Sequence, residues 1–179
     1  MKKIFSMLLA LAMMFSLVAC GGTTAEPTTA PAETVKNYEG TMEELVNTII
    51  TEQPVEFMGG LHPVDLADTS EDGLWNLKYY TGLDSAEGIA DIAAFEPMMS
   101  SLAFSLVALR TTGDVKTVAE AMKSGIDTRK WFCVEANDLQ VVSFGDVVML
   151  IMVDNVTGLT SQAYVDAFAK ICGGEVTVY

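Results

Sequence analysis

Beyond residue 40, hydrophobic residues recur at two spacings, one typical of helices and the other typical of strands. Apolar residues every three or four positions predict an amphipathic helix with one buried face. This spacing occurs over residues 41–53, 114–126 and 160–172. The sequence therefore predicts three helices, and a shorter one over residues 71–80, before a turn at Gly82.

Polar residues at the ends of these segments agree with the predicted helices. Thr41 and Glu44 have the spacing of a capping box, and Pro54 ends the first segment. Either Thr160 or Ser161 is expected to cap the last helix.

Four apolar runs have the length of strands, and they come in two pairs. They cover residues 88–96, 102–110, 139–144 and 147–153. The linkers within the pairs, PMMSS and Gly145-Asp146, are short and turn-like, so each pair predicts a hairpin. Met149 to Val153 does not alternate, which predicts a central strand covered on both faces.

The order of these elements predicts an α+β fold. Its core is an antiparallel sheet of about four strands in two hairpins, in the order β-β-α-β-β-α, with helices packed on it and an N-terminal helix before it. Residues 55–69 show no regular pattern, and residues 175–179 are a candidate edge strand.

The first twenty residues have the layout of a secretory signal. Lys2 and Lys3 precede an apolar run over residues 4–18, which is shorter than the roughly 20 residues that an ordinary transmembrane helix needs. The run ends in Leu17-Val18-Ala19-Cys20, which resembles the lipobox of bacterial lipoproteins. That resemblance implies a diacylglyceryl group on the Cys20 sulfur and cleavage before it. The alternative is an ordinary signal peptide with a chance cysteine.

The lipobox divides the chain into three parts. Residues 1–19 are the predicted lipoprotein signal peptide, residues 20–40 the lipidated cysteine with a flexible tether, and residues 41–179 a single α+β domain. The tether is rich in Thr, Ala, Pro and Gly and has no apolar stripe to bury. Two acyl chains are enough for stable anchoring, so the membrane is an expected partner through Cys20.

The net charge of the chain limits the classes of partner that it is expected to bind. After residue 19 the chain keeps 8 basic and 24 acidic residues, a formal net charge of −16. Nucleic-acid binding depends on Lys and Arg neutralising phosphates, so we expect no nucleic-acid partner. The same balance disfavours electrostatic attraction to anionic lipids, which leaves the lipid itself as the anchor.

Two cysteines remain once Cys20 is assigned to lipid. Cys133 and Cys172 each follow an apolar residue, so they are either buried free thiols or a disulfide in an oxidising compartment.

Several segments together resemble a known family. A lipobox, a Thr/Pro tether, TMEELVNTII, YYTGLD, FEPMMSSLAFSLVALR and DVKTVAEAMKSGI occur in that order. In this arrangement the chain resembles small lipoproteins of clostridia and related Gram-positive bacteria, described as a domain of unknown function. The resemblance covers roughly residues 41–155. It implies no catalytic residue, since none is established for that family.

The sequence contains few candidate catalytic or metal-binding residues. His62 is the sole histidine, which excludes sites built on several histidines, and it is either a catalytic base or a solvated loop residue. Asp68, Ser70 and Asp72 have the alternating oxygens of a calcium loop, but its twelfth position is Tyr79 instead of glutamate. The same residues also suit the start of a helix.

Aromatic residues form the last candidate group. Trp75 and Tyr79 are one helical turn apart, and Tyr80, Trp131 and Phe132 add further rings. Such a stripe is either part of the core or a platform for a ligand.

The sequence thus predicts a membrane-anchored, extracytoplasmic lipoprotein with a non-enzymatic domain. We expect it to bind an envelope protein, another envelope component or a small ligand, with no cofactor and no catalytic residue. The alternative is an extracytoplasmic enzyme that uses carboxylates or a metal. A transporter's solute receptor is disfavoured, because such receptors generally have two lobes and need a longer chain.

Overall fold

The computed structural model describes residues 36–179 of the chain. The predicted signal peptide (residues 1–19), the lipidation site Cys20 and the tether up to residue 35 lie outside the described residues. Within residues 36–179, no helix is both long enough and apolar enough to cross a bilayer.

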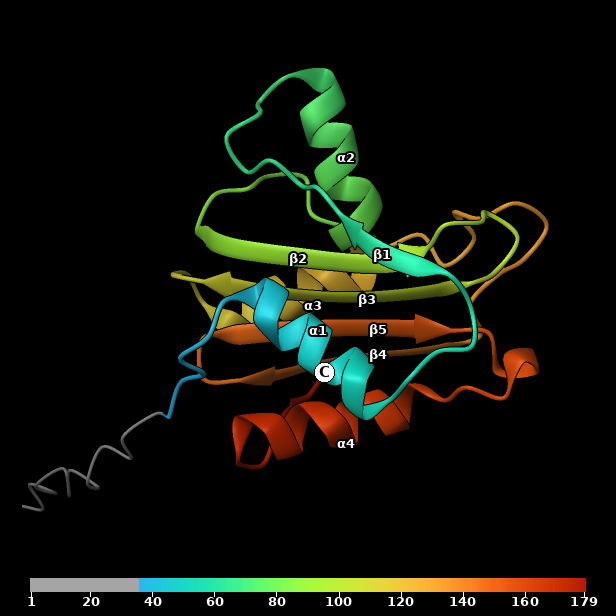
Figure 1. Ribbon diagram of the computed structural model, residues 1–179. Coiled ribbons are helices and arrows are strands. Elements are labelled where there is room, and N and C mark those ends of the chain that lie inside the picture. The colour runs from blue at the N-terminus through green and yellow to red at the C-terminus, as the bar shows by residue number, and fades with distance from the viewer. Residues whose placement is uncertain (1–35) are drawn as a thin grey trace, which may run out of the picture. The chain divides into compact units, whose positions relative to one another are not determined.

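The described residues form one antiparallel sheet with helices on both faces (Figure 1). The strands lie in the order β1-β2-β3-β5-β4-β6. Their bounds are β1 Gly59–His62, β2 Ile89–Pro97, β3 Phe104–Thr111, β4 Asp138–Phe144, β5 Val147–Val153 and β6 Thr177–Val178. The helices are α1 Met42–Glu52, α2 Glu71–Thr81, α3 Val115–Gly125 and α4 Ser161–Cys172, with a 3-10 turn, η1, at Asn155–Thr157.

The α+β prediction is confirmed, but the sheet has six strands where about four were expected. Both expected hairpins form, since β2 pairs with β3 and β4 with β5. The candidate edge strand at the C-terminus is β6. The missed strand is β1, whose sequence GGLH has neither alternation nor strong strand propensity. It becomes a strand by pairing with β2.

The predicted central strand is β5, and all seven of its residues are buried. It lies between β3 and β4, so both of its edges are paired. Its side chains alternate between two hydrophobic clusters, with Met149 and Ile151 in one and Val148 and Leu150 in the other. This explains why its sequence is continuously apolar.

Different helices cover the two faces of the sheet. In the view of Figure 1, α1 and α4 lie in front of it and α3 lies behind. The front cluster contains the buried residues of α1 and α4, and the rear cluster contains those of α3 together with Leu77 of α2.

The first helix forms as its pattern predicts. The N–H of Glu44 donates to Thr41 Oγ1 at 3.2 Å, and the N–H of Thr41 donates to Glu44 Oε2 at 3.0 Å, which completes the capping box. The side chains of its stripe have no solvent exposure: Met42, Leu45, Val46 and Ile49. This helix is therefore part of the core.

The last helix is capped differently from the expectation. Thr160 is its N-cap residue but makes no side-chain hydrogen bond to the helix. Instead, the N–H and hydroxyl of Ser161 donate to the Asp138 carboxylate, at 2.8 and 2.5 Å. The Asp138 carboxylate on β4 therefore caps the N-terminus of α4.

Packing begins before the predicted domain start at Thr41. Asn37 lies so close to Gly145 that a Cβ atom at this glycine would be 2.4 Å from Asn37 Oδ1. Gly145 also has a φ of +56°, which suits glycine at the β4–β5 turn. Residues 36–40, which we assigned to the tether, therefore belong to the domain.

The two cysteines are free thiols, so the disulfide alternative is wrong. Cys172 is buried in the front cluster. Cys133 is exposed, which corrects the expectation of burial, and it follows Trp131 of the rear cluster.

Candidate functional site

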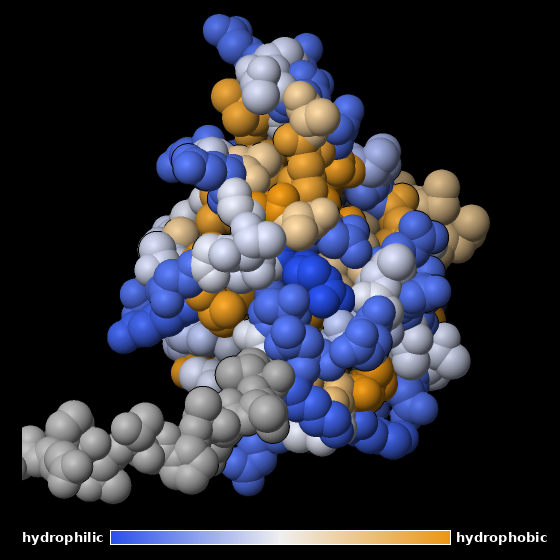
Figure 2. Space-filling view, turned by 90° about the vertical axis from the view of Figure 1, so that its left-hand side faces the viewer, coloured by the Kyte–Doolittle hydropathy of each residue, from blue (hydrophilic) through white to orange (hydrophobic). Residues whose placement is uncertain are grey.

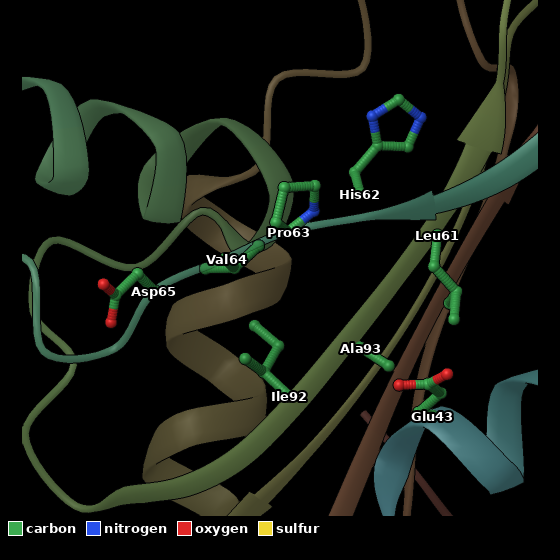
Figure 3. A pocket seen from close by; sticks show the side chains of 8 residues that line it. All are labelled: Glu43, Leu61, His62, Pro63, Val64, Asp65, Ile92 and Ala93. Carbon is green, nitrogen blue, oxygen red and sulfur yellow. The ribbon is translucent and has the colours of Figure 1, made fainter.

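An open groove of about 490 Å³ lies where β1 separates from β2. We call it the fork groove, and Figure 3 shows the eight residues that line it: Glu43, Leu61, His62, Pro63, Val64, Asp65, Ile92 and Ala93. Its volume falls within the usual range of small-molecule sites.

The groove forms because β1 is much shorter than β2. The β1–β2 pairing runs from Gly59 opposite Pro97 to His62 opposite Ala94, and the next residue is Pro63. Proline has no N–H to continue a ladder, so the chain turns away from the sheet. The part of β2 between Ile89 and Ala93 is left without a strand on this side.

The direction of the backbone groups follows from the register. The N–H of Met98 donates to the carbonyl of Met58 at 2.9 Å, so every second residue of β2 from Met98 faces β1. Ile92 is in that set, but β1 ends at His62, opposite Ala94, and so has no residue opposite Ile92. The side chain of Asp91 accepts the Ile92 N–H at 2.9 Å. The Ile92 carbonyl faces the groove, where β1 offers it no partner.

The side chains give the groove an apolar middle and acidic ends. In Figure 3, Val64 and Ile92 lie between Asp65 on one side and Glu43, at the start of α1, on the other. Both carboxylate residues are exposed. Figure 2 views the side of the molecule on which β2 begins, and its hydrophobic side chains gather in the upper half, with hydrophilic ones below.

His62 is the last residue of β1 and is half-buried, so neither the loop position nor full solvation is correct. Its ring lies 5.5 Å from the Tyr80 ring, at an interplanar angle of 33°. In Figure 3 the imidazole points away from Glu43 and Asp65. It therefore lines the groove's upper border and forms no acid–base pair with these carboxylates.

A buried ion pair between Lys130 and Glu96 lies next to the Tyr80 ring. Lys130 Nζ is 2.5 Å from Glu96 Oε1, and the two side chains are only 3% and 5% exposed. Burial lowers the pKa of the Lys130 ammonium, although the Glu96 carboxylate acts in the opposite direction. The same ammonium donates to the Tyr79 carbonyl at 2.9 Å.

Three aromatic rings surround the Lys130 ammonium. Their centroids lie 4.4 Å (Tyr79), 5.2 Å (Tyr80) and 5.3 Å (Trp131) from Nζ, within the range of cation–π attraction. The ion pair therefore joins α2, the loop after α3 and β2. With both charges already paired and enclosed, it serves to position these elements.

The aromatic residues do not share one environment. Trp131 is buried, as the core interpretation requires, whereas Trp75 and Phe132 are 66% and 72% exposed. Trp75 stacks on Tyr79 with ring centroids 5.1 Å apart. The core interpretation is thus wrong for Trp75 and Phe132.

The candidate calcium ligands form the start of α2 instead. The Ser70 N–H donates to Asp68 Oδ1 at 2.9 Å, and Ser70 Oγ accepts the Gly73 N–H at 3.2 Å. Hydrogen bonds from Ser70 lower the pKa of Asp68. Across residues 36–179, no three His, Cys, Asp or Glu side chains lie close enough to hold a metal ion. Ser70 is the N-cap residue of α2 and Asp72 lies in its first turn, as the helix-start interpretation requires.

Sequence reasoning missed the fork groove and the ion pair. One signal for the pair was present, because Glu96 stands within an apolar, strand-length run. A charged residue in a buried strand requires a partner. Nothing in the local pattern identified Lys130 as that partner.

Comparisons with protein-family models, with curated proteins and with solved structures found no match for this chain.

Proposed function

We propose that this protein is a lipid-anchored, extracytoplasmic binding protein. Diacylglyceryl on Cys20 would hold it at the cell membrane, and its domain would bind an envelope protein, another envelope component or a small ligand without chemical conversion. The resemblance to clostridial lipoproteins agrees with this proposal. Membership of that family stays a prediction.

The fork groove carries the binding part of the proposal. It combines an apolar middle, two exposed carboxylates and a backbone carbonyl that β1 leaves without a partner. Binding sites typically have this composition, in which apolar surface supplies affinity and a few polar groups fix orientation. No observation on residues 36–179 favours the alternative of a carboxylate- or metal-dependent enzyme.

A thermal-shift screen tests the binding part. Metals, sugars, amino acids and peptides are screened, and a true ligand should raise the melting temperature through binding to the folded state. The variant Val64→Arg, which fills the groove, should lose that shift, whereas Phe132→Arg should keep it. A ligand that shifts Val64→Arg as much as the wild type would place binding elsewhere.

The anchor is tested by Cys20→Ser, which removes the sulfur that carries the diacylglyceryl group in the lipobox interpretation. We expect an uncleaved precursor or a form released into the medium, measured by cell fractionation and intact mass. The matched control Cys133→Ser loses an exposed thiol of the domain and should still fractionate with membranes. A Cys20→Ser protein in the membrane at the mature mass would refute the lipobox interpretation.

A further inference from the structure

We propose that the occupant of the fork groove is an extended, basic segment of a partner protein, which adds a short strand to the uncovered edge of β2. The inference rests on the proposed binding function and names the class of partner.

The backbone of β2 supports strand addition. Its uncovered part, Ile89 to Ala93, spans about 13 Å from the first Cα to the last at roughly 3.3 Å per residue. An extended peptide binds such an edge through main-chain hydrogen bonds. Because Asp91 already occupies the Ile92 N–H, the accessible group is the Ile92 carbonyl. The incoming segment must therefore supply an N–H.

The charged residues on the two sides of the groove determine which side chains the segment carries. Glu43 and Asp65 are exposed on opposite sides of Val64 and Ile92 (Figure 3). No Lys or Arg lines the groove. In Figure 3 Glu43 and Asp65 lie on opposite sides of β2, so they would flank an added strand. Complementarity therefore favours a segment that combines an apolar side chain over Val64 and Ile92 with basic side chains near the two carboxylates.

Other occupants fit less well. The chain's own residues 21–35 contain Glu26 and Glu33 but no Lys or Arg, so they carry the same sign of charge as the groove. Pro27 and Pro31 also remove two potential N–H donors. A second copy of the chain would bring another strongly acidic domain to an acidic site.

The test uses the full chain, purified in a non-ionic detergent, and measures fluorescence anisotropy of labelled peptides. The probe is a seven-residue peptide of alternating Lys and Val. Its two controls are the peptide of alternating Glu and Val, and the Lys/Val peptide with N-methylated Val, which keeps the charge but loses those N–H donors. We expect the first peptide to bind and each control to bind at least tenfold more weakly.

Protein variants separate the groove from the general acidity of the surface. The double variant Glu43→Gln/Asp65→Asn should weaken binding of the Lys/Val peptide at least tenfold. Asp166→Asn/Glu175→Gln removes the same charge from exposed positions in α4 and next to β6, at the opposite edge of the sheet, and should change affinity less than twofold. Circular dichroism of both variants checks that they are folded.

Four results would overturn the inference. Equal binding of the N-methylated peptide would exclude strand addition, and equal weakening by both double variants would show non-specific attraction. If the chain associates with itself, and the double variant Glu43→Gln/Asp65→Asn strengthens that association, the occupant of the groove would be a second copy of the chain. If the thermal-shift screen finds a groove ligand while the Lys/Val peptide does not bind, the inference fails but the proposed binding function stands.

Discussion

Arg110 holds Tyr38 at the start of the domain, because Nη2 of this β3 residue donates to the Tyr38 carbonyl at 2.8 Å. The same nitrogen donates to the Gly40 carbonyl at 2.8 Å, and Nη1 contacts the Asp146 carboxylate at 3.0 and 3.3 Å. The Arg110 side chain is only 23% exposed. Charge-assisted bonds from one guanidinium therefore join the segment before α1 to β3 and to the β4–β5 turn.

Replacing this arginine should loosen the N-terminal segment. For Arg110→Met we expect unfolding free energy to fall by about 1.5–3 kcal/mol, the usual range for hydrogen bonds to a charged group. Trypsin should also cleave after Lys36 faster than in the wild type. The control Arg129→Met breaks an exposed pair with Glu135 and should change stability by less than about 1 kcal/mol. Equal effects of both variants in urea melts would contradict this role.

The buried ion pair predicts a large effect with a specific rescue. Lys130→Met leaves Glu96 charged and enclosed, which typically lowers stability by about 3–5 kcal/mol. Adding Glu96→Leu should recover most of that loss, because the uncompensated charge is gone. Lys78→Met, which breaks the exposed pair with Asp84, should have an effect below about 1 kcal/mol. Chemical denaturation measures all three variants, and the absence of rescue would show that packing, and not charge, dominates at this position.

Truncation tests whether the first helix belongs to the core. Soluble forms that begin at Gly21 and at Tyr38 should melt at nearly the same temperature, since neither loses α1. A form that begins at Pro54 loses four fully buried side chains and should be insoluble or melt far lower. Replacing even one of them, Leu45→Ala, should lower stability by about 2–5 kcal/mol. Equal melting temperatures for the three forms would remove α1 from the core.

The two thiols should react at very different rates. In the form that begins at Gly21, we expect iodoacetamide to modify exposed Cys133 quickly and Cys172 only after unfolding. Burial raises the pKa of the Cys172 thiol to about 12, so little reactive thiolate exists at neutral pH. Mass spectrometry counts the modified thiols. In Cys133→Ser the fast reaction should disappear, and a remaining fast reaction would mean that Cys172 is accessible.

Alkaline pH should destabilise the domain. Burial raises the pKa of Cys172 from 9.0 to about 12 and that of Tyr164 from 10.0 to about 12. Between these limits the unfolded chain binds fewer protons than the folded one, so stability present below about pH 9 is lost as pH rises toward 12. Urea midpoints measured from pH 8 to 11.5 follow this loss. Tyr164→Phe should show a smaller decline above pH 10, and an unchanged decline would exclude Tyr164 as a cause.

The sequence alone determined the elements whose side chains repeat with a regular period. The stripe from Met42 to Ile49, the capping box and the continuously apolar β5 each predict burial from a few neighbouring residues, and the structure confirms each one. Local patterns succeed here because helix and strand geometry fixes which side chains share a face.

Only the tertiary structure decided the features that join residues far apart in the chain. Gly59–His62 is a strand because β2 lies beside it, and the fork groove exists because Pro63 ends that pairing while β2 continues. Asp138 caps a helix that begins after the next strand, and Lys130 neutralises Glu96 from the loop beyond α3. No periodic pattern in the sequence indicates such long-range contacts. They depend on the order of the strands in the sheet and on which buried polar groups need a hydrogen-bond or charge partner.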